Sequence, residues 1–294
     1  MELPLEAVPN FSEGRDAETL DALRAALSRQ AAVLDVHTDT DHGRSVFTVV
    51  GEDAALVDAL VTAVAVAVER IDLRRHTGVH PRVGAADVVP LVPIRPEQMA
   101  RARSAALAVA ERVGEEVGLP VFLYGELATG RGPAFFRRGG PEELQRRVEA
   151  GELTPDRGPA RLHATAGAVL VGARRPLIAF NVNLRGAGTG VAGEIAAIVR
   201  ESGGGFPGVR ALGLELGEGG VAQVSMNVED WEAVALPDII QRIEDEARLR
   251  GAEVAGSELV GLMPAGAAAA AARGALRIAG FDASRLLELR LLDR

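Results

Sequence analysis

Hydrophobic and polar positions in the first half of the chain follow two patterns, one typical of strands and one typical of helices. Apolar residues recur three or four positions apart in the predicted helices, and Asp16 stands where the first helix would be capped. The elements predicted in chain order are a strand at 3–8, a helix from 16, strands at 32–36 and 45–50, a helix at 53–71 and a strand at 85–92. This order, β-α-β-β-α-β, is the split βαβ arrangement of a ferredoxin-like unit.

The second half of the chain repeats this order after a middle region of its own. The middle region is predicted to hold a helix at 96–117, a strand at 121–124, a short amphipathic helix at 141–150, a polar loop at 158–167 and a strand at 169–172. The repeat is predicted as a strand at 177–183, a helix at 191–200, strands at 209–216 and 221–228, a helix at 237–250 and a strand at 253–262, followed by an alanine-rich helix at 267–278 and a final apolar segment. We therefore expect an α/β (α+β) fold of two ferredoxin-like subdomains with mixed sheets, residues 1–175 and 176–294.

The composition excludes several classes of protein. The 294 residues include no cysteine, which excludes disulfide scaffolds, thiolate metal sites and cysteine nucleophiles. Acidic residues outnumber basic ones by 41 to 32, and this net charge of −9 argues against a nucleic-acid-binding protein. The first residues lack the basic stretch of a signal peptide, and the longest apolar run, 54–68, is interrupted by Asp58 and too short to span a bilayer. We expect a cytoplasmic protein that binds neither nucleic acid nor membranes.

The segment RRHTGVHPRVGAADVVP, residues 74–90, carries the strongest chemical signal in the chain. Arg74, Arg75 and Arg82 lie close together in it, beside two histidines. Arginine binds carboxylates and phosphates through a planar fork, and histidine moves protons near neutral pH. The alternative is a solvated basic turn at a helix C-terminus, which would explain Arg74 and Arg75 but not the proline and glycines around His80. The segment therefore predicts an anion-binding site with His80 at its centre.

A second cluster, His37-x-Asp39-x-Asp41-His42, offers imidazole and carboxylate groups at a predicted turn. These groups suit several divalent metals. The sequence contains no HExxH or GxSxG motif and no paired-glycine phosphate loop, which leaves a metal site without support. We favour a second anchor for a polar, cationic substrate and expect no metal.

Seven motifs stand in the order and spacing found in one enzyme family. They are VPNFSEGRD, RHTGVHPRVGAADVVPLVPI, VFLYGE, LIAFNVNL, ESGGGFPGVRALG, AQVSMN and SELVGLMP, and together they run from Val8 to Pro264. The sequence resembles the glutamate formiminotransferases, the transferase half of the formiminotransferase-cyclodeaminase family, in their monofunctional form. The resemblance implies transfer of a formimino group from N-formimino-L-glutamate to N5 of tetrahydrofolate in histidine degradation, with tetrahydrofolate as co-substrate and no metal. It also implies a homodimer, and two subdomains packed through their sheets, with helices outside and a charged tunnel between them.

The same resemblance assigns roles to particular residues. The histidine of the family's GxHPR motif is catalytic, and that position here is His80. The donor carries two carboxylates and a cationic formimino group, which makes Arg44, Arg74 and Arg82 candidates for the carboxylates and Asp39 a candidate for the cation. His80 would take the proton from N5 as a general base and return it to the departing nitrogen as a general acid. The family's folate-contacting loop maps to GPARLHATAG (the folate segment), that is to Gly158, Pro159, Ala160, Arg161, Leu162, His163, Ala164, Thr165, Ala166 and Gly167.

The folate segment and His80 leave two other functions open. The only ring in the folate segment that could stack on a pterin is His163. A related hydrolase or deiminase could use His80 on formiminoglutamate without folate. A non-catalytic folate-binding module could use His80 only to hold its ligand. Both alternatives stay open at this point.

Overall fold

The structure is a computed structural model of the chain, and it describes residues 3–128, 130–216, 221–276 and 281–286. The chain divides into two compact units, residues 1–175 and 176–294. The predicted final apolar segment and the last two residues of the predicted alanine-rich helix lie outside the described residues. Among the described helices, none combines the length and the hydrophobicity that a membrane crossing requires.

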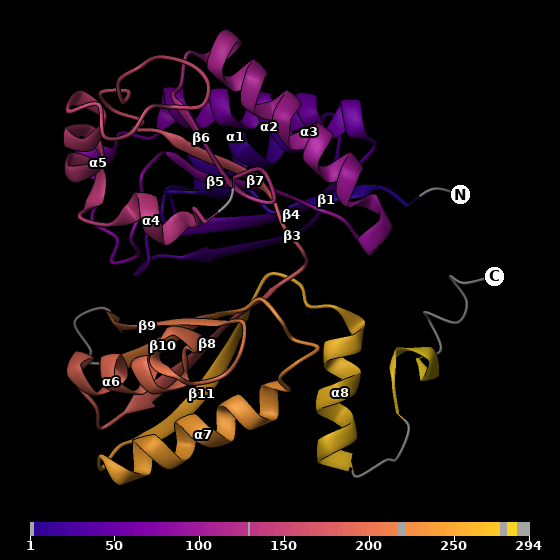
Figure 1. Ribbon diagram of the computed structural model, residues 1–294, viewed down its shortest axis with the longest axis vertical. Coiled ribbons are helices and arrows are strands. Elements are labelled where there is room, and N and C mark those ends of the chain that lie inside the picture. Colours follow the sequence, from indigo (N-terminus) through magenta and orange to yellow (C-terminus); the bar gives the residue numbers. More distant parts are fainter. Residues whose placement is uncertain (1–2, 129, 217–220, 277–280, 287–294) are drawn as a thin grey trace. The chain divides into compact units, whose positions relative to one another are not determined.

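The first unit is built on a seven-stranded mixed sheet (Figure 1). The strands lie in the order β3-β4-β1/β2-β5-β7-β6, antiparallel except where β7 lies parallel between β5 and β6. The β-α-β-β-α-β order predicted for this part of the chain is confirmed, and β7 and β6 extend the sheet beyond β5. The strands are β1 (Leu5–Ala7), β2 (Asn10–Phe11), β3 (Ala32–Asp39), β4 (Arg44–Gly51), β5 (Ala86–Val92), β6 (Val121–Gly125) and β7 (Val169–Ala173).

Two short strands, β1 and β2, lie on either side of Pro9, where one strand at 3–8 was predicted. Ala7 lies opposite Val49 and Asn10 opposite Val46 on β4, so the register continues across the break. Proline has no N–H for the ladder, although the carbonyl of Pro9 still accepts a hydrogen bond. The continued register keeps Asn10 between β4 and β5, beside the candidate site.

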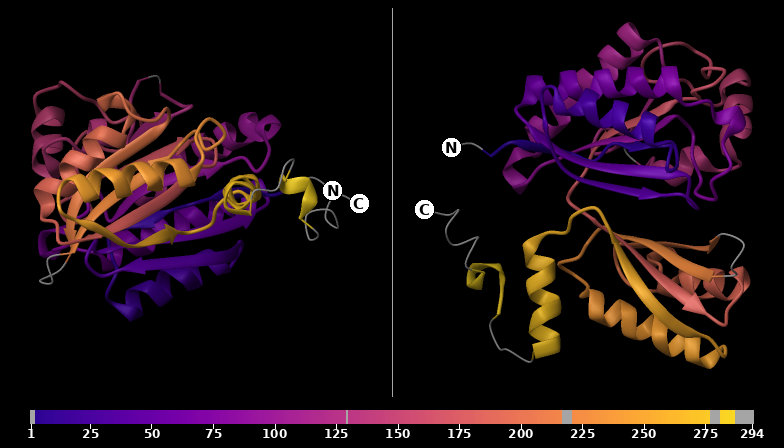
Figure 2. Two further views of the ribbon diagram at one scale, coloured as in Figure 1. Left: turned by 90° about the horizontal axis from the view of Figure 1, so that it is seen from below. Right: turned by 180° about the vertical axis from the view of Figure 1, so that it is seen from behind.

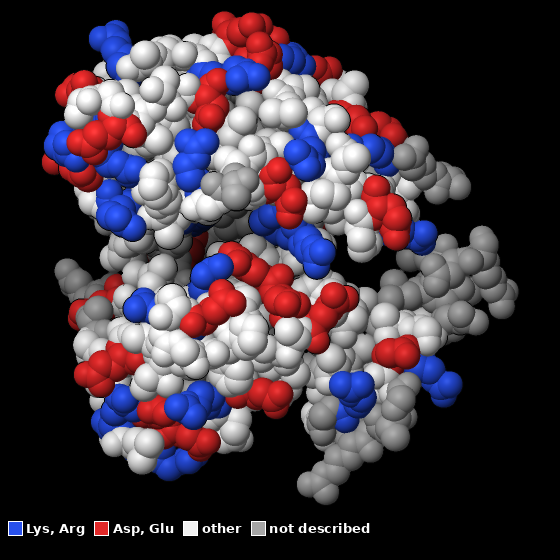
Figure 3. Space-filling view, viewed as in Figure 1, with Lys and Arg blue, Asp and Glu red and all other residues white. Residues whose placement is uncertain are grey.

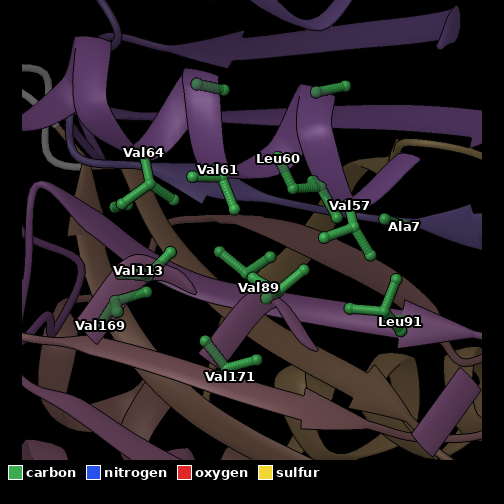
Figure 4. Close-up of a cluster of buried hydrophobic side chains, with 14 of the residues drawn as sticks. Ala7, Val57, Leu60, Val61, Val64, Val89, Leu91, Val113, Val169 and Val171 are labelled. Carbon is green, nitrogen blue, oxygen red and sulfur yellow. The ribbon is translucent and has the colours of Figure 1, made fainter. Parts of the chain in front are cut away.

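Three helices cover one face of this sheet, as Figure 2 shows. They are α1 (Ala17–Ser28), α2 (Asp53–Arg70) and α3 (Met99–Arg112). The prediction that Asp16 caps α1 is confirmed, since its side chain accepts from Glu18 N at 3.2 Å. The helix predicted at 96–117 is α3 together with a 3₁₀ turn, Pro96–Gln98, and a π turn, Val113–Val117. Valines and leucines of α2 pack onto those of β5 and β7 (Figure 4): Val57, Leu60, Val61 and Val64 against Val89, Leu91, Val169 and Val171.

Two further helices, α4 (Pro133–Arg137) and α5 (Gly140–Glu149), pack on the other face of the sheet. Val169 and Val171 of β7 belong to the core beneath α2 and α3, whereas Leu170 belongs to a separate core with Phe136 of α4 and Leu144 of α5. Successive residues of a strand point to opposite faces, so these two cores lie on opposite sides of β7. The sequence pattern did not predict α4, because five residues are too few to show a helical period.

The second unit is a four-stranded sheet with α6 (Thr189–Val199) and α7 (Leu236–Leu249) on one face (Figure 1). The strand order β11-β8-β10-β9 is that of a ferredoxin-like unit, as predicted. The sheet is antiparallel, however, and the prediction that it is mixed was wrong. Each helical crossover returns the chain two strand positions away, so strands of the same direction are never neighbours. The remaining elements are β8 (Ile178–Arg185), β9 (Val209–Leu216), β10 (Val221–Val228), β11 (Glu253–Val260) and the alanine-rich α8 (Ala265–Leu276).

Candidate active site

His80 lies in the loop that joins α2 to β5 (the His80 loop), and backbone hydrogen bonds hold both ends of this loop. At its start, Leu73 N donates to Thr165 O at 2.8 Å, and at its end Ala85 N donates to Ala166 O at 2.9 Å. Both acceptors belong to the folate segment. The structure therefore places the C-terminal end of the folate segment beside the loop that carries His80.

The folate segment closes on itself at this end. His163 and Gly167 exchange two backbone hydrogen bonds, of 2.8 and 2.9 Å. The ring of His163 also serves the turn, because its Nδ1 atom accepts from Ala166 N at 3.1 Å. The first residues of the segment, 158–161, are exposed. A ligand can thus reach the start of the segment, while its end is built into the fold.

Two glycines allow the turn between β3 and β4 to pack directly on the His80 loop. Gly43 has a φ of +59°, and a Cβ atom there would lie 2.5 Å from the ring of His76. A Cβ atom at Gly78 would lie 2.1 Å from the carbonyl oxygen of His42. No side chain fits at either position without displacement of the neighbouring segment. The two glycines therefore set the shape of the site; of the two glycines that the motif suggested for this role, Gly78 is one, and Gly84, where a Cβ atom would lie 1.7 Å from the carbonyl oxygen of Ala168, is the other.

Arg82 ties the His80 loop together through backbone carbonyl groups. Its Nη2 donates to Gly78 O at 2.6 Å and to His42 O at 3.2 Å, and its Nε donates to His80 O at 3.0 Å. Its Nη1 contacts the ring of His76. Burial lowers the pKa of Arg82 to about 10, which still leaves it cationic at neutral pH. The guanidinium that was predicted to bind a substrate carboxylate thus donates to the protein's own backbone.

Arg44, the first residue of β4, touches the ring of His80. Its Nη1 lies 2.6 Å from Nδ1 and 3.3 Å from Nε2 of His80, and the same Nη1 donates to Asp87 Oδ2 at 3.2 Å. Its Nε and Nη2 both donate to Asn10 Oδ1, at 2.9 and 2.6 Å. Burial lowers the pKa of Arg44 to about 9. The short strand β2 thus contributes the amide that orients this arginine.

Asp87 is the carboxylate of the site and is only 1% exposed. Its Oδ1 accepts from Val83 N at 2.8 Å, and its Oδ2 accepts from both Arg44 and Arg137. Arg137 is the last residue of α4, and 15% of its side chain is exposed. Sequence reasoning missed both Asp87 and Arg137. The run PAFFRR held a signal for the arginine, since proline favours a helix start and the buried Phe136 fixes the residue that follows it.

Three guanidinium groups, those of Arg44, Arg82 and Arg137 (the arginine cluster), act on His80. Burial, and then electrostatic repulsion from neighbouring basic groups, chiefly the guanidinium groups of Arg44, Arg137 and Arg82, hold the pKa of His80 well below its ordinary value. His80 is therefore neutral at pH 7 and can accept a proton. Acidic and basic side chains are interspersed on the visible face of each unit (Figure 3).

Asp39 and Arg74, two of the predicted substrate residues, have partners within their own segments. Asp39 Oδ1 accepts from Asp41 N and His42 N, both at 2.8 Å. Arg74 pairs with Asp72 at 2.6 Å, and 67% of its side chain is exposed. In the described part of the chain, Arg74 shares no hydrogen bond with the arginine cluster. The structure thus brings Arg44 and Arg82 to His80, but not Arg74.

Histidine and carboxylate groups lie near one another at the turn between β3 and β4. His42 Nε2 is 3.9 Å from Asp39 Oδ2, and the ring of His42 lies 5.8 Å from that of His80. Within the first unit alone, the described residues bring no three histidine or carboxylate groups close enough together to hold a metal ion. The residues around His80 favour binding of an anion, because they supply three cations and one buried carboxylate.

Comparison with known proteins places both units in a single protein family. Residues 4–174 match the family model of the formiminotransferase domain, N-terminal subdomain, and residues 179–277 match that of the formiminotransferase domain. The chain is 40% identical to a glutamate formimidoyltransferase of Streptococcus pyogenes serotype M1, over 98% of each chain. It is 36% identical to a glutamate formimidoyltransferase of Thermoplasma acidophilum, over 98% of this chain and 97% of the relative. It is 39% identical to a formimidoyltransferase-cyclodeaminase of Sus scrofa, over 88% of this chain and 50% of the relative.

Proposed function

Because the chain belongs to the formiminotransferase family, we propose that it transfers the formimino group of N-formimino-L-glutamate to N5 of tetrahydrofolate in histidine degradation. The products are 5-formiminotetrahydrofolate and L-glutamate. The observation that carries this proposal is a neutral histidine, His80, held beside a cluster of three arginines. A neutral imidazole accepts a proton, and a cationic cluster attracts a donor with two carboxylates.

His80 acts first as a base and then as an acid. N5 of the folate attacks the formimino carbon and forms a tetrahedral intermediate, and the N5 proton passes to His80. The imidazolium then protonates the glutamate nitrogen as the bond between that nitrogen and the formimino carbon breaks. An anionic donor offsets part of the charge of the arginine cluster, which raises the pKa of His80 and lets it hold the proton between the two steps. Such acid–base catalysis contributes about 10²–10⁴-fold to a rate.

The contacts of the arginines divide their roles. Arg44 keeps its predicted role at a donor carboxylate, because it lies against the ring that serves the reacting nitrogen. Arg82 is assigned to positioning the His80 loop, since its donors reach backbone carbonyls. Arg74 is removed from the carboxylate site because it pairs with Asp72 at an exposed position. Asp39 stays the partner of the cationic formimino group, with one of its two oxygens used by the turn.

Tetrahydrofolate is the co-substrate in this proposal, and the folate segment contacts it. The support is the backbone hydrogen bonding that joins the end of the segment to both ends of the His80 loop. The proposed reaction needs no metal ion, since each of its steps is an addition, an elimination or a proton transfer. A cytoplasmic location and a homodimeric assembly complete the proposal.

One assay separates this function from its alternatives. The purified protein is mixed with N-formimino-L-glutamate, with and without tetrahydrofolate, and the release of glutamate and the formation of 5-formiminotetrahydrofolate are followed. We expect both products, in equal amounts, only when tetrahydrofolate is present. Glutamate release at the same rate without tetrahydrofolate would instead establish a hydrolase or deiminase. Folate binding without any turnover would establish a binding module.

The His80→Ala variant tests the role of the histidine in the same assay. We expect kcat to fall by at least about 100-fold, the low end of acid–base effects, while the KM for each substrate changes little. Circular dichroism of the variant confirms that the fold is retained. A variant that turns over at a near-normal rate would remove His80 from the mechanism.

A further inference from the structure

The position of Arg137 is fixed by the core on one side and by a carboxylate on the other. The preceding residue, Phe136, is fully buried, and its ring lies 5.1 Å from that of Phe122 on β6. The guanidinium of Arg137 reaches Asp87, which also accepts from Arg44. Arg137 therefore stands in the same hydrogen-bonded group as the arginine that touches His80.

The charges of this group do not balance among its own members. Asp87 supplies one negative charge, while the arginine cluster supplies three positive charges. The electrostatic influence of Arg137 reaches both Arg44 and His80, since it lowers the pKa of each. Uncompensated charge with limited access to water is unfavourable. The site thus favours any ligand that brings negative charge to it.

One hydrogen-bond donor in the group lacks an acceptor. The Nε atom of Arg137 is buried and has no hydrogen-bond partner in the described part of the chain. The Nε atoms of Arg44 and Arg82, by contrast, donate to Asn10 Oδ1 and to His80 O. A buried donor left without an acceptor is rare in folded proteins, and at a functional site it points to an acceptor brought by a ligand.

The chemistry of the donor substrate identifies this acceptor. In N-formimino-L-glutamate the reacting nitrogen is bonded to the α-carbon, which also carries the α-carboxylate. The α-carboxylate carbon is two bonds from this nitrogen, whereas the γ-carboxylate carbon is four bonds from it, so a group beside the residue that protonates the nitrogen meets the α-carboxylate first. We infer that Arg137 binds the α-carboxylate of formiminoglutamate through its Nε atom, beside Arg44. This inference rests on the proposed function.

A comparison of two substrates tests the inference. N-formimino-4-aminobutanoate is the same donor without the α-carboxylate. For the wild-type protein we expect kcat/KM to favour formiminoglutamate over this analogue by at least about tenfold. For Arg137→Gln we expect kcat/KM for formiminoglutamate to fall while that for the analogue changes little, so that the preference is lost. The KM for tetrahydrofolate stays unchanged.

The variant Arg138→Gln is the matched control, because Arg138 follows Arg137 directly in the chain and is exposed. We expect it to keep the wild-type preference. Arg137→Lys keeps the charge beside Asp87 but not the Nε donor, and should lose most of the preference as well. The ratio of two substrates is independent of the fraction of folded protein, so it separates ligand binding from a purely structural role.

Three results would overturn the inference. The preference for formiminoglutamate could survive in Arg137→Gln, and if the rates with both donors fell equally at the same time, Arg137 would have a structural role. The variant could instead lose discrimination against N-formimino-2-aminobutanoate, which lacks the γ-carboxylate, and this would assign Arg137 to the other end of the donor. If the wild-type protein shows no folate-dependent turnover, the proposed function fails. Calorimetry of formiminoglutamate binding to the wild-type protein and to Arg137→Gln then still tests the contact between Arg137 and the α-carboxylate. Equal affinities of the two proteins would count against this contact.

Discussion

Replacement of Asp87 by asparagine should destabilise the first unit strongly. Asp87 is 1% exposed and accepts from two guanidinium groups, those of Arg44 and Arg137. Asparagine has nearly the same shape, and its side-chain oxygen can still accept from Val83 N, which donates at 2.8 Å in the native protein. The substitution therefore removes charge while it leaves the packing almost intact. What stays behind is an arginine cluster without its carboxylate.

The size of the effect follows from the cost of a buried charge that loses its partner. Removal of one member of a buried ion pair typically costs about 3–5 kcal/mol, since the remaining charge is left without compensation. For a unit of 150–250 residues, 1 kcal/mol lowers the melting temperature by about 2–4 °C, so we expect a decrease of about 6–20 °C. Asp87→Asn should also lower the catalytic rate, because Arg44 loses an acceptor beside His80.

Scanning calorimetry of Asp87→Asn measures this destabilisation directly. Asp21→Asn is the control, since Asp21 is exposed on α1 and its loss should change the melting temperature by less than about 2 °C, given the small energies of surface positions. Addition of formiminoglutamate should restore part of the lost stability, because its carboxylates supply the missing negative charge. A melting temperature for Asp87→Asn within about 2 °C of wild type would refute the view that this carboxylate balances the arginine cluster.

Three other expectations concern pH, the backbone and the His80 loop. Burial and the arginine cluster lower the pKa of His80, so its neutral form persists below pH 6.5 in the free enzyme and the acid limb of the kcat/KM profile should lie at a lower pH than that of the kcat profile, since bound donor offsets the charge of the cluster. Profiles whose acid limbs coincide would contradict this. Gly43→Ala should lower the free energy of unfolding by about 1–3 kcal/mol, because its φ of +59° and the nearby ring of His76 disfavour a side chain. Urea denaturation measures the loss, and an unchanged midpoint would count against the close packing. Arg82→Lys should lower kcat with little change in the KM for formiminoglutamate, since the single nitrogen of lysine cannot reproduce the fork whose Nε and Nη2 atoms reach three separate carbonyls. Steady-state kinetics in which only the KM rises would return Arg82 to the substrate.

The regular elements of both units follow from local pattern, and their departures from the prediction have local causes. Helical periodicity located α1 and α2 because each is long enough to show a buried face. The period could not reveal α4, which has five residues, or the division of the first strand at Pro9. The pattern of hydrophobic positions also could not predict that the second sheet is antiparallel. The relative direction of neighbouring strands depends on which strand position the chain reaches after each helix.

The candidate site was predictable in its residue types but not in its partners. The density of arginines near His80 indicated anion binding; the structure places Arg44 and Arg82 beside His80, and the binding itself stays a prediction. The pattern could not show that Arg82 donates to the backbone of its own loop. It also could not bring Asp87 and Arg137 to this place, because contacts between residues 50 positions apart arise only when the sheet and α4 are assembled.

The hydrogen bonds between the His80 loop and the folate segment have a consequence for how the two substrates influence each other. Leu73, Val83 and Ala85 of the loop bond to the backbone at 165–168, so the two segments form one continuous backbone network. Any restraint placed on one segment reduces the freedom of the other, without a change in average shape. An acceptor molecule seated on the folate segment would then hold the proton-transferring ring more firmly, and a donor bound alone would meet a looser one. Such coupling would protect the formimino group from loss to water until a molecule able to receive it is in place.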